Sequence, residues 1–329
     1  MTVNIRLEEM DIMKKFVGEA NLIIKCCKLY YEENFTQSEI GNILGVSRPT
    51  VSRLLDEGRK SGVVKIEIIN PIENNYGILE RNIEKKYNLR EVIIVDDDKD
   101  DDTQKKNIAK ACAEYLKRIV KKDDNIGVSM GTTIKNIGKY IEPNPKLNLR
   151  LIPLIGGVGQ SQIEIHPNNV VMDLARAFRG DFKLLHAPAV VSNAEIRNTF
   201  LKEESIKNIL EMGKDVNIAI VGIGSPISDK STMMSSGYFD IDDLKIFKQQ
   251  GAAGDICLQF YDINGFSEGF EFNNRVIGVN LDNIKKIDTV IGVAGGEEKV
   301  EAIIGALNGE FINVLITNYS NAKAIYNRH

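Results

Sequence analysis

Two groups of residues in this sequence have side chains of the kind that bind anions. The first lies in TQSEIGNILGVSRPTVSRLLDEG, residues 36–58, where Arg48 and Arg53 share one short segment. Arginine can pair bidentately with guanine, and serine and threonine hydroxyls can contact phosphates or base edges. This segment therefore predicts an element that reads double-stranded DNA through Gln37, Ser47, Arg48, Pro49, Thr50, Ser52 and Arg53.

The second group consists of glycine-containing loops that follow predicted strands. Loops at the carboxyl ends of parallel strands form the ligand crevice of such sheets, and helix N-termini there direct N–H groups toward an anion. The hydroxyls of Thr132 and Thr133 together with the amine of Lys299 suit a phosphate. The predicted site comprises Gly131, Thr132, Thr133, Gly156, Gly157, Gly295, Gly296 and Lys299, with a further glycine loop at 222–225.

Two carboxylates follow glycine-rich turns, Asp255 in GAAGDICLQF and Glu268 in DINGFSEGF. Either could accept hydrogen bonds from sugar hydroxyls, and either could instead cap a helix or lie in a surface turn. Lys299 has a bland alternative too, because lysines one turn into a helix are usually solvated. Neither a Walker A loop nor a complete G-x-G-x-x-G fingerprint is present, which argues against nucleotide hydrolysis and NAD chemistry.

Two short helices must position the arginines. Thr36 followed by Glu39 predicts a capping box, and Ser47 with Pro49 predicts the start of the next helix. The stretch VVKIEII, residues 63–69, is β-branched and predicts the strand of a wing. A three-helix module that binds protein instead of DNA remains the alternative. Six apolar residues would lock the helix pair: Ile40, Leu44, Val46, Val51, Leu54 and Leu55.

Beyond residue 91 apolar, β-branched runs alternate with helical stretches, which predicts a large doubly wound α/β domain with a parallel sheet. Residues 72–90 form an amphipathic stretch that predicts either a linker helix pairing with its own copy or one more core helix. The expected domains are 1–70, a winged helix-turn-helix, 71–90, a linker helix with a possible role in oligomerisation, and 91–329. The expected strands are EVIIV, NIGVS, LRLIPLI, FKLL, DVNIAIVGIG, GDICLQF, RVIGV, DTVIGVAG and INVLIT.

Composition fits an ordinary soluble protein of two domains. The 329 residues are 43% hydrophobic and 27% charged, with no apolar run of 18 residues and no signal-peptide pattern, so we expect a cytoplasmic protein that does not bind membranes. The formal net charge is −4, and the acidic run DDDKDDD at 96–102 contributes to it; this run lacks the glycine and glutamate of an EF-hand loop. Three histidines and four cysteines without metal-ligand spacing predict no metal site and reduced core thiols.

Nearly the whole chain resembles the SorC/DeoR-type bacterial sugar-responsive transcription regulators. The resemblance rests on residues 36–58 followed by GVVKIEI, on GAAGDICLQFYDINGF, on NNRVIGVNLDNIKK, and on IGVAGGEEKVEAIIGALNGEFINVLIT. It implies a winged helix-turn-helix joined to an effector domain similar to sugar-phosphate isomerases, assembled as a homo-dimer or homo-tetramer on operator DNA. It also implies that Gly131, Thr132, Thr133 and Lys299 hold an effector's phosphate and that Asp255 reaches its hydroxyls.

Two positions depart from the family pattern. Ile155 stands where the fructose-bisphosphate-responsive branch has an arginine for a second phosphate, which favours a monophosphate effector. Asn318-Tyr319 stands where the family usually has an acidic pair. The sequence thus predicts a sugar-phosphate-responsive regulator, with a repressor of a carbohydrate operon as the expected form and no cofactor beyond the phosphorylated monosaccharide effector. The alternative is a sugar-phosphate isomerase or deaminase with an accessory DNA-binding head, using Asp255 or Glu268 as base.

Overall fold

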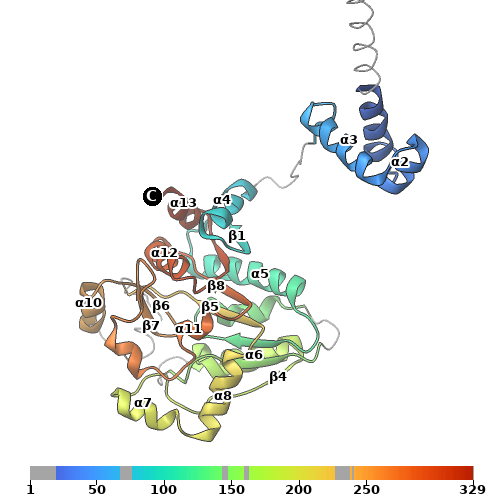
Figure 1. Ribbon diagram of the computed structural model, residues 1–329. Coiled ribbons are helices and arrows are strands. Elements are labelled where there is room, and N and C mark those ends of the chain that lie inside the picture. The colour runs from blue at the N-terminus through green and yellow to red at the C-terminus, as the bar shows by residue number, and fades with distance from the viewer. Residues whose placement is uncertain are drawn as a thin grey trace, which may run out of the picture. The chain divides into compact units, whose positions relative to one another are not determined.

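The chain divides into two compact units, residues 1–73 and 74–329 (Figure 1). The computed structural model describes residues 20–66, 76–142, 147–158, 163–226, 238 and 241–328. Each unit has its own hydrophobic core.

The first unit is a small helical domain. Residues 20–31 are helical, and α2 (Gln37–Leu44) and α3 (Arg48–Lys60) follow. The capping box predicted at the start of α2 is confirmed, because the Thr36 and Glu39 side chains each accept a bond from the other residue's backbone N–H. Ser47 caps α3, as predicted. The core of the unit is built from Cys26, Cys27, Leu29, Ile40, Val51, Leu54 and Leu55.

The second unit alternates strands and helices. Its strands are β1 Glu91–Val95, β2 Asn125–Val128, β3 Arg150–Pro153, β4 Asp181–Phe182, β5 Ile218–Gly222, β6 Ala252–Ile256, β7 Gln259–Asp262, β8 Thr289–Val293 and β9 Val314–Asn318. Its α-helices are α4 Gly77–Tyr87, α5 Asp101–Ile119, α6 Pro167–Phe178, α7 Ala194–Phe200, α8 Glu204–Lys214, α10 Ile241–Gln249, α11 Leu281–Ile284, α12 Val300–Asn308 and α13 Tyr319–Asn327. The described residues also include the 3₁₀ helices η1 Ile134–Tyr140, η2 Ile163–Ile165, η3 Glu271–Arg275 and η4 Glu297–Lys299.

Seven strands form one parallel sheet in the order β1-β9-β8-β5-β2-β3-β4. The chain moves outward from β2 through β3 to β4, and then returns to place β5 on the other side of β2. The strand order therefore reverses between β2 and β5. In open α/β sheets such a reversal leaves a crevice at the carboxyl ends of the strands.

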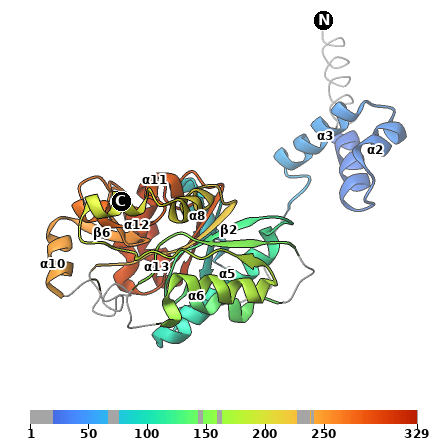
Figure 2. The ribbon, with the colours of Figure 1, turned by 90° about the horizontal axis from the view of Figure 1, so that it is seen from below.

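Both faces of the sheet are covered, as a doubly wound fold requires. Along β5, Ile218 and Ile220 face a core shared with α5, η1 and α6, whereas Ala219 and Val221 face the core shared with α8 and α12. Figure 2 shows α5 and α6 on one side of the strands and α8 and α12 on the other. The period-two alternation of buried side chains thus confirms the predicted α/β architecture.

Helix α4 covers the edge of the sheet. The Glu80 and Glu84 carboxylates accept hydrogen bonds from the N–H groups of Ile94 (2.9 Å) and Val92 (3.1 Å) on the edge strand β1. Ile83 is fully buried between them. These contacts pack α4 against the edge strand of the second unit. Pairing of this helix with its own copy stays a prediction.

Four expected strands differ from the structure. FKLL, residues 182–185, is in a strand only at Phe182, because β4 ends there. GDICLQF is not one strand but the antiparallel hairpin β6–β7, because Cys257 and Leu258 both adopt left-handed conformations and turn the chain. RVIGV forms only isolated bridges at Val276 and Gly278. In the predicted wing, residues 63–66 are not extended strand, and the rest of VVKIEII lies outside the described residues.

The acidic run serves the start of α5. Asp100 caps the helix by accepting from the backbone N–H of Thr103 (2.9 Å), and Asp101 and Asp102 lie in its first turn, where the helix dipole favours negative charge. Within the part of the chain that the structure describes, no group of three or more His, Cys, Asp or Glu residues could hold a metal ion. All four cysteines are buried free thiols. None of the described helices is long and apolar enough to span a bilayer.

Gly45 ends α2 at φ 65° with an N–H that bonds back to Gly41, which sets the angle between α2 and α3. A side chain in this conformation costs about 1–2 kcal/mol. We therefore expect Gly45→Ala to lower the free energy of unfolding of the first unit by about 1 kcal/mol, measured by urea denaturation. Asparagine tolerates left-handed φ, so Gly45→Asn is the matched control and should lose less; equal losses for both would contradict this explanation.

Candidate effector pocket and DNA-facing helix

A pocket lies at the point where the strand order reverses. It is lined by the ends of β2, β5 and β8, which are neighbours or near neighbours in the sheet, and by the turn of the β6–β7 hairpin. Six of the predicted effector residues line it: Gly131, Thr132, Thr133, Asp255, Gly295 and Lys299. The structure thus brings together side chains that lie up to 168 positions apart in the sequence.

The loop after β2 offers donors to this pocket. Gly131, Thr132 and Thr133 precede η1, and their backbone N–H groups donate to no other backbone group of the described residues. The carbonyl of Thr132 is already used, since it accepts from the Asn136 side chain at 2.9 Å. The loop therefore presents free N–H groups and two part-exposed hydroxyls, which is the chemistry of an anion cradle.

Asp255 is the buried acid of the pocket, with 6% of its surface exposed. Its Oδ2 accepts a hydrogen bond from the N–H of Leu258 at 3.1 Å, and its backbone pairs with Gly224 through two hydrogen bonds. A Cβ built on Gly224 would lie 1.7 Å from Asp255 Oδ1, so only glycine leaves room for the carboxylate. Burial raises the pKa of Asp255 to about 6, against the opposing charge of Lys299 and the Leu258 hydrogen bond.

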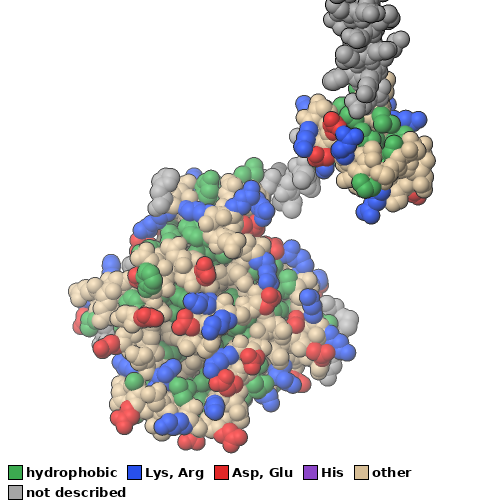
Figure 3. All heavy atoms as spheres, viewed as in Figure 1, with side chains coloured by type: hydrophobic (Ala, Val, Ile, Leu, Met, Phe, Trp, Pro, Cys, Tyr) green, Lys and Arg blue, Asp and Glu red, His purple; other side chains and the backbone are tan. Residues whose placement is uncertain are grey.

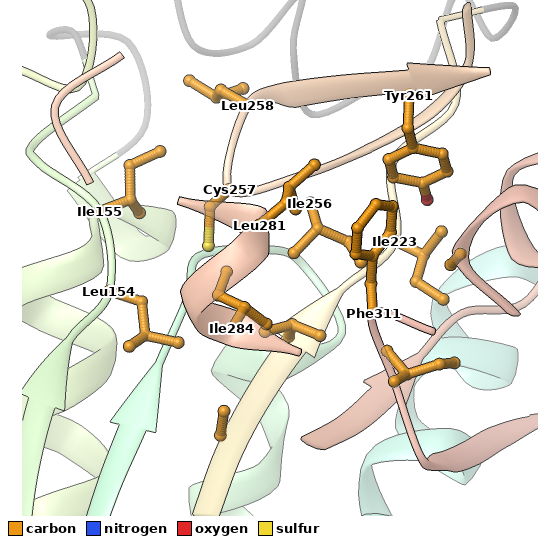
Figure 4. Close-up of a cluster of buried hydrophobic side chains, with 14 of the residues drawn as sticks. Leu154, Ile155, Ile223, Ile256, Cys257, Leu258, Tyr261, Leu281, Ile284 and Phe311 are labelled. Atoms are coloured by element: carbon orange, nitrogen blue, oxygen red, sulfur yellow. The ribbon is translucent and has the colours of Figure 1, made fainter. Parts of the chain in front are cut away.

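The hairpin turn that carries Asp255 is strained. Cys257 (φ 53°) and Leu258 (φ 58°) are consecutive residues in the left-handed region, where branched or bulky side chains are unfavourable. Figure 4 shows both at the turn of the hairpin, between Ile256 and the strand that continues to Tyr261. The Tyr261 hydroxyl donates to the Ala302 carbonyl at 3.0 Å and so holds the hairpin on α12. Because burial raises the pKa of the Cys257 thiol, its sulfur is not a reactive thiolate.

Lys299 supplies the cation of the pocket. Burial lowers the pKa of its amine, while the charges of Asp255 and Glu298 act in the opposite direction. No hydrogen bond or ion pair to a described residue engages this amine, whereas the neighbouring Lys105 pairs with Asp101 at 2.6 Å. A half-buried lysine whose amine bonds to none of the described residues gains more from an incoming anion than a solvated one does.

Four predicted or considered residues lie elsewhere. Gly156 and Gly157 do not line this pocket, and their N–H groups donate to the carbonyls of Ile277 (2.9 Å) and Ala187 (2.7 Å). A Cβ on Gly156 would lie 2.5 Å from the Pro188 carbonyl, so close packing of loops explains this glycine. Gly296 lines an adjoining hollow with Asn318 and Ser320. Glu268 is exposed and lies outside the pocket.

The predicted DNA-contact residues divide by exposure. Val51, Leu54 and Leu55 are buried, which leaves the side chains of Arg48, Pro49, Ser52 and Arg53 exposed on α3. Ser47 and Thr50 hydroxyls bond each other at 2.8 Å, and Gln37 is half-buried at the start of α2. Among the described residues, the Arg53 guanidinium has one weak ion-pair partner, the Glu57 carboxylate at 3.7 Å. This is the arrangement of a recognition helix with two available guanidinium groups.

Comparison with known proteins agrees with both features. Residues 73–327 match the family described as "Putative sugar-binding domain", and residues 25–61 match "Sigma-70, region 4". The chain is 34% identical over 307 residues to a deoxyribonucleoside regulator from Bacillus subtilis (strain 168), covering 93% of this chain and 97% of that protein. It is 31% identical over 312 residues to a sorbitol operon regulator from Klebsiella pneumoniae, covering 93% and 98%.

The fold agrees with these matches. The crystal structure of the full-length sorbitol operon regulator SorC from Klebsiella pneumoniae matches with a TM-score of 0.72 and 30% identity, covering 93% of this chain and 98% of that chain. The chain belongs to the SorC/DeoR-type family of transcriptional regulators. The resemblance inferred from the four sequence segments is therefore confirmed.

For this SorC/DeoR-type regulator, sequence patterns did not identify every residue that lines the pocket. The pattern GDICLQF predicts a strand through Cys257 and Leu258, and nothing in the letters ICLQF indicates a turn. Asp101 and Lys105 come from the first turns of α5 and reach the pocket only because β1 and α5 flank β9. The glycine loop at 222–225 was noted, but the close approach that requires Gly224 depends on a partner 31 positions later.

We expect the regulator's free energy of unfolding to depend on pH through the titration of Asp255. A pKa raised from 3.8 to about 6 means that the folded state keeps a proton that the unfolded chain has released. The stability from this proton is complete below pH 3.8 and is lost as the pH rises through 6, by about 3 kcal/mol in total at ~1.36 kcal/mol per pKa unit. Asp255→Asn keeps the acceptor for Leu258 but cannot titrate.

We therefore expect the stability of Asp255→Asn relative to wild type to increase between pH 4 and pH 7, measured by urea unfolding of the second unit's transition. Asp215→Asn, at an exposed position at the end of α8, is the control and should follow the wild-type curve. Parallel curves for Asp255→Asn and wild type would show that this carboxyl group does not titrate in that range.

Proposed function

We propose that this regulator binds operator DNA through α3 and that a phosphorylated monosaccharide, bound in the pocket at the ends of β2, β5 and β8, changes that affinity. The observation that carries the proposal is the combination in one pocket of unused N–H groups at Gly131 to Thr133, an unpaired cation at Lys299 and a buried carboxyl group at Asp255. The first two suit a phosphate, and the third suits sugar hydroxyls.

A monophosphate fits this chain better than a bisphosphate. Ile155 is fully buried and bridges Gly278, so the position offers no cation to a second phosphate. We further propose that the regulator is a cytoplasmic homo-dimer or homo-tetramer that represses a carbohydrate operon. The named relatives, regulators of deoxyribonucleoside and sorbitol genes, support a sugar-derived effector.

The isomerase or deaminase alternative has less support. Both relatives described above are named as regulators, and Glu268, one of the two bases considered, lies outside the pocket. We propose that a sugar phosphate binds in the pocket and is released without being isomerised or deaminated. Incubation of the protein with each monophosphate, followed by chromatography for isomerised or deaminated product, tests this; a product that disappears in Asp255→Ala would restore the enzyme.

Effector binding should be visible as thermal stabilisation. A ligand at about 100 times its dissociation constant adds about 2.7 kcal/mol to the folded state. We expect one pentose or hexose monophosphate to raise the melting temperature of the wild type, its unphosphorylated parent to have no effect, and Lys299→Ala to lose the response. Lys286→Ala, an exposed lysine outside the pocket, is the matched control and should respond normally. A monophosphate that stabilises Lys299→Ala as much as wild type would remove Lys299 from the site.

DNA binding should depend on the two outward arginines. Arg48→Ala and Arg53→Ala should each weaken operator binding by about 1–3 kcal/mol, because each removes a contact to a base edge or phosphate. Lys60→Ala at the far end of α3 removes the same charge and is the control, since its amine is paired with Asp56 at 2.7 Å. Fluorescence anisotropy across a salt series measures all three; equal small losses would indicate only general electrostatics and not recognition by this end of α3.

A further inference from the structure

The unusual pair Asn318-Tyr319 lies between the pocket and the place where the chain enters the second unit. Asn318 is the last residue of β9 and is 5% exposed. It stands at the N-cap position of α13, yet its side chain makes no cap bond to that helix. Its two polar atoms are used in contacts to distant parts of the chain instead.

The first contact is to the glycine loop beside the pocket. Asn318 Oδ1 accepts a hydrogen bond from the N–H of Gly296 at 3.3 Å. Gly296 lies between Gly295 and η4, which ends at Lys299, and both Gly295 and Lys299 line the pocket. Gly296 has φ 105°, a conformation that glycine adopts without strain. Asn318 is therefore attached to the segment that carries the pocket's cation.

The second contact is to the acidic loop after β1. Asn318 Nδ2 donates to Asp97 Oδ1 at 2.6 Å, and the same carboxylate accepts from the backbone and hydroxyl of Ser320 at 3.0 and 2.6 Å. Asp97 thus takes over the capping of α13 that Asn318 does not perform. The Asn318 amide is hydrogen-bonded to both Gly296 and Asp97. We therefore expect a displacement of either loop to displace the other.

The acidic loop in turn holds Tyr76. The Tyr76 hydroxyl donates to Asp96 Oδ1 at 2.5 Å, and its ring stacks on Tyr319 with centroids 5.0 Å apart. Tyr76 is the first described residue of the second unit and directly precedes α4. Through residues 67–75 the chain continues from here to the DNA-facing unit. Figure 1 shows α4 and α13 beside each other in this unit.

We propose that Asn318 is a positioning residue that sets the Gly295–Lys299 loop of the effector pocket and links its state, through Asp97 and Asp96, to Tyr76 at the entry of the second unit. The proposal rests on the phosphate-binding function proposed above. An anion held by Lys299 and the loop N–H groups restrains Gly296, and the hydrogen-bonded chain then restrains Tyr76. The coupling is reciprocal, so restraint of Tyr76 also affects anion binding in the pocket.

Asn318→Asp separates the two halves of this link. A carboxylate still accepts from the Gly296 N–H but cannot donate to Asp97, and it places like charges at hydrogen-bond distance. Tyr76→Phe breaks the link at its other end, because it removes the bond to Asp96 while the ring can still stack on Tyr319. It also keeps the test open if the buried Asn318 variant folds poorly. The matched controls are Asn327→Asp and Tyr326→Phe, which make the same two changes at exposed positions of α13.

Hydrogen–deuterium exchange of the full chain with and without millimolar inorganic phosphate is the test. In wild type and in both controls, phosphate should slow exchange in peptides covering 295–299 and also 76–84, the second by about fivefold or more, the lower end of ordinary coupling between sites. In Asn318→Asp and Tyr76→Phe, phosphate should still protect 295–299 but leave 76–84 unchanged.

Two outcomes would overturn the proposal in different ways. If phosphate protects neither peptide of the wild type, the phosphate assignment of the pocket fails and this inference falls with it. If phosphate protects 295–299 in the wild type but does not change 76–84, the pocket stands and only the link through Asn318 is wrong. The same conclusion follows if phosphate protects 76–84 in Asn318→Asp and Tyr76→Phe as much as in the wild type.

Discussion

The burial of one carboxyl group, that of Asp255, constrains the rest of the effector pocket. A carboxylate removed from water must be compensated, and here the compensation comes from the Leu258 N–H and the positive charge of Lys299. The Leu258 bond requires the tight hairpin turn with two left-handed residues, and the carboxylate leaves no room for a side chain at Gly224. The Asp255 end of the pocket is therefore set by β5 and the hairpin, and the Lys299 end by η4 and the loop after β2.

This arrangement makes the pocket polar and leaves some of its hydrogen-bonding groups without partners among the described residues. On one side, the N–H groups of residues 131–133 and the Lys299 amine can bind an anion. On the other side, the Asp255 carboxyl group can donate or accept a hydrogen bond. An effector that completes these bonds gains more free energy than the same contacts would supply on an exposed surface. Charged residues of both signs are interspersed over the visible face of the second unit (Figure 3), so the overall charge of −4 does not describe the chemistry of the pocket.

Much of the fold was predictable because its signals are local. The capping box at Thr36, the cap at Ser47 and the apolar runs of β1, β2, β5, β8 and β9 depend on neighbours within a few residues. The pocket residues Gly131, Thr132, Thr133, Gly295 and Lys299 were predictable for a related reason, since parallel strands bring the loops that follow them to one edge. What the sequence did not reveal depends on contacts between distant segments. The turn at Cys257 and Leu258 exists because Asp255 binds Leu258, and Gly156 serves the close approach of Pro188. The same holds for α4, whose apolar stripe could not show that Glu80 and Glu84 pair with the edge of β1.

The central claim is that one ligand in the pocket changes the affinity of α3 for DNA. The most direct measurement is a titration of fluorescent operator DNA with the full-length protein at fixed salt, repeated with a saturating sugar monophosphate and with its unphosphorylated parent. We expect the dissociation constant for operator DNA to shift about fivefold or more with the monophosphate and not to change with the parent. Identical operator binding curves in the presence of a monophosphate that demonstrably occupies the pocket would contradict it.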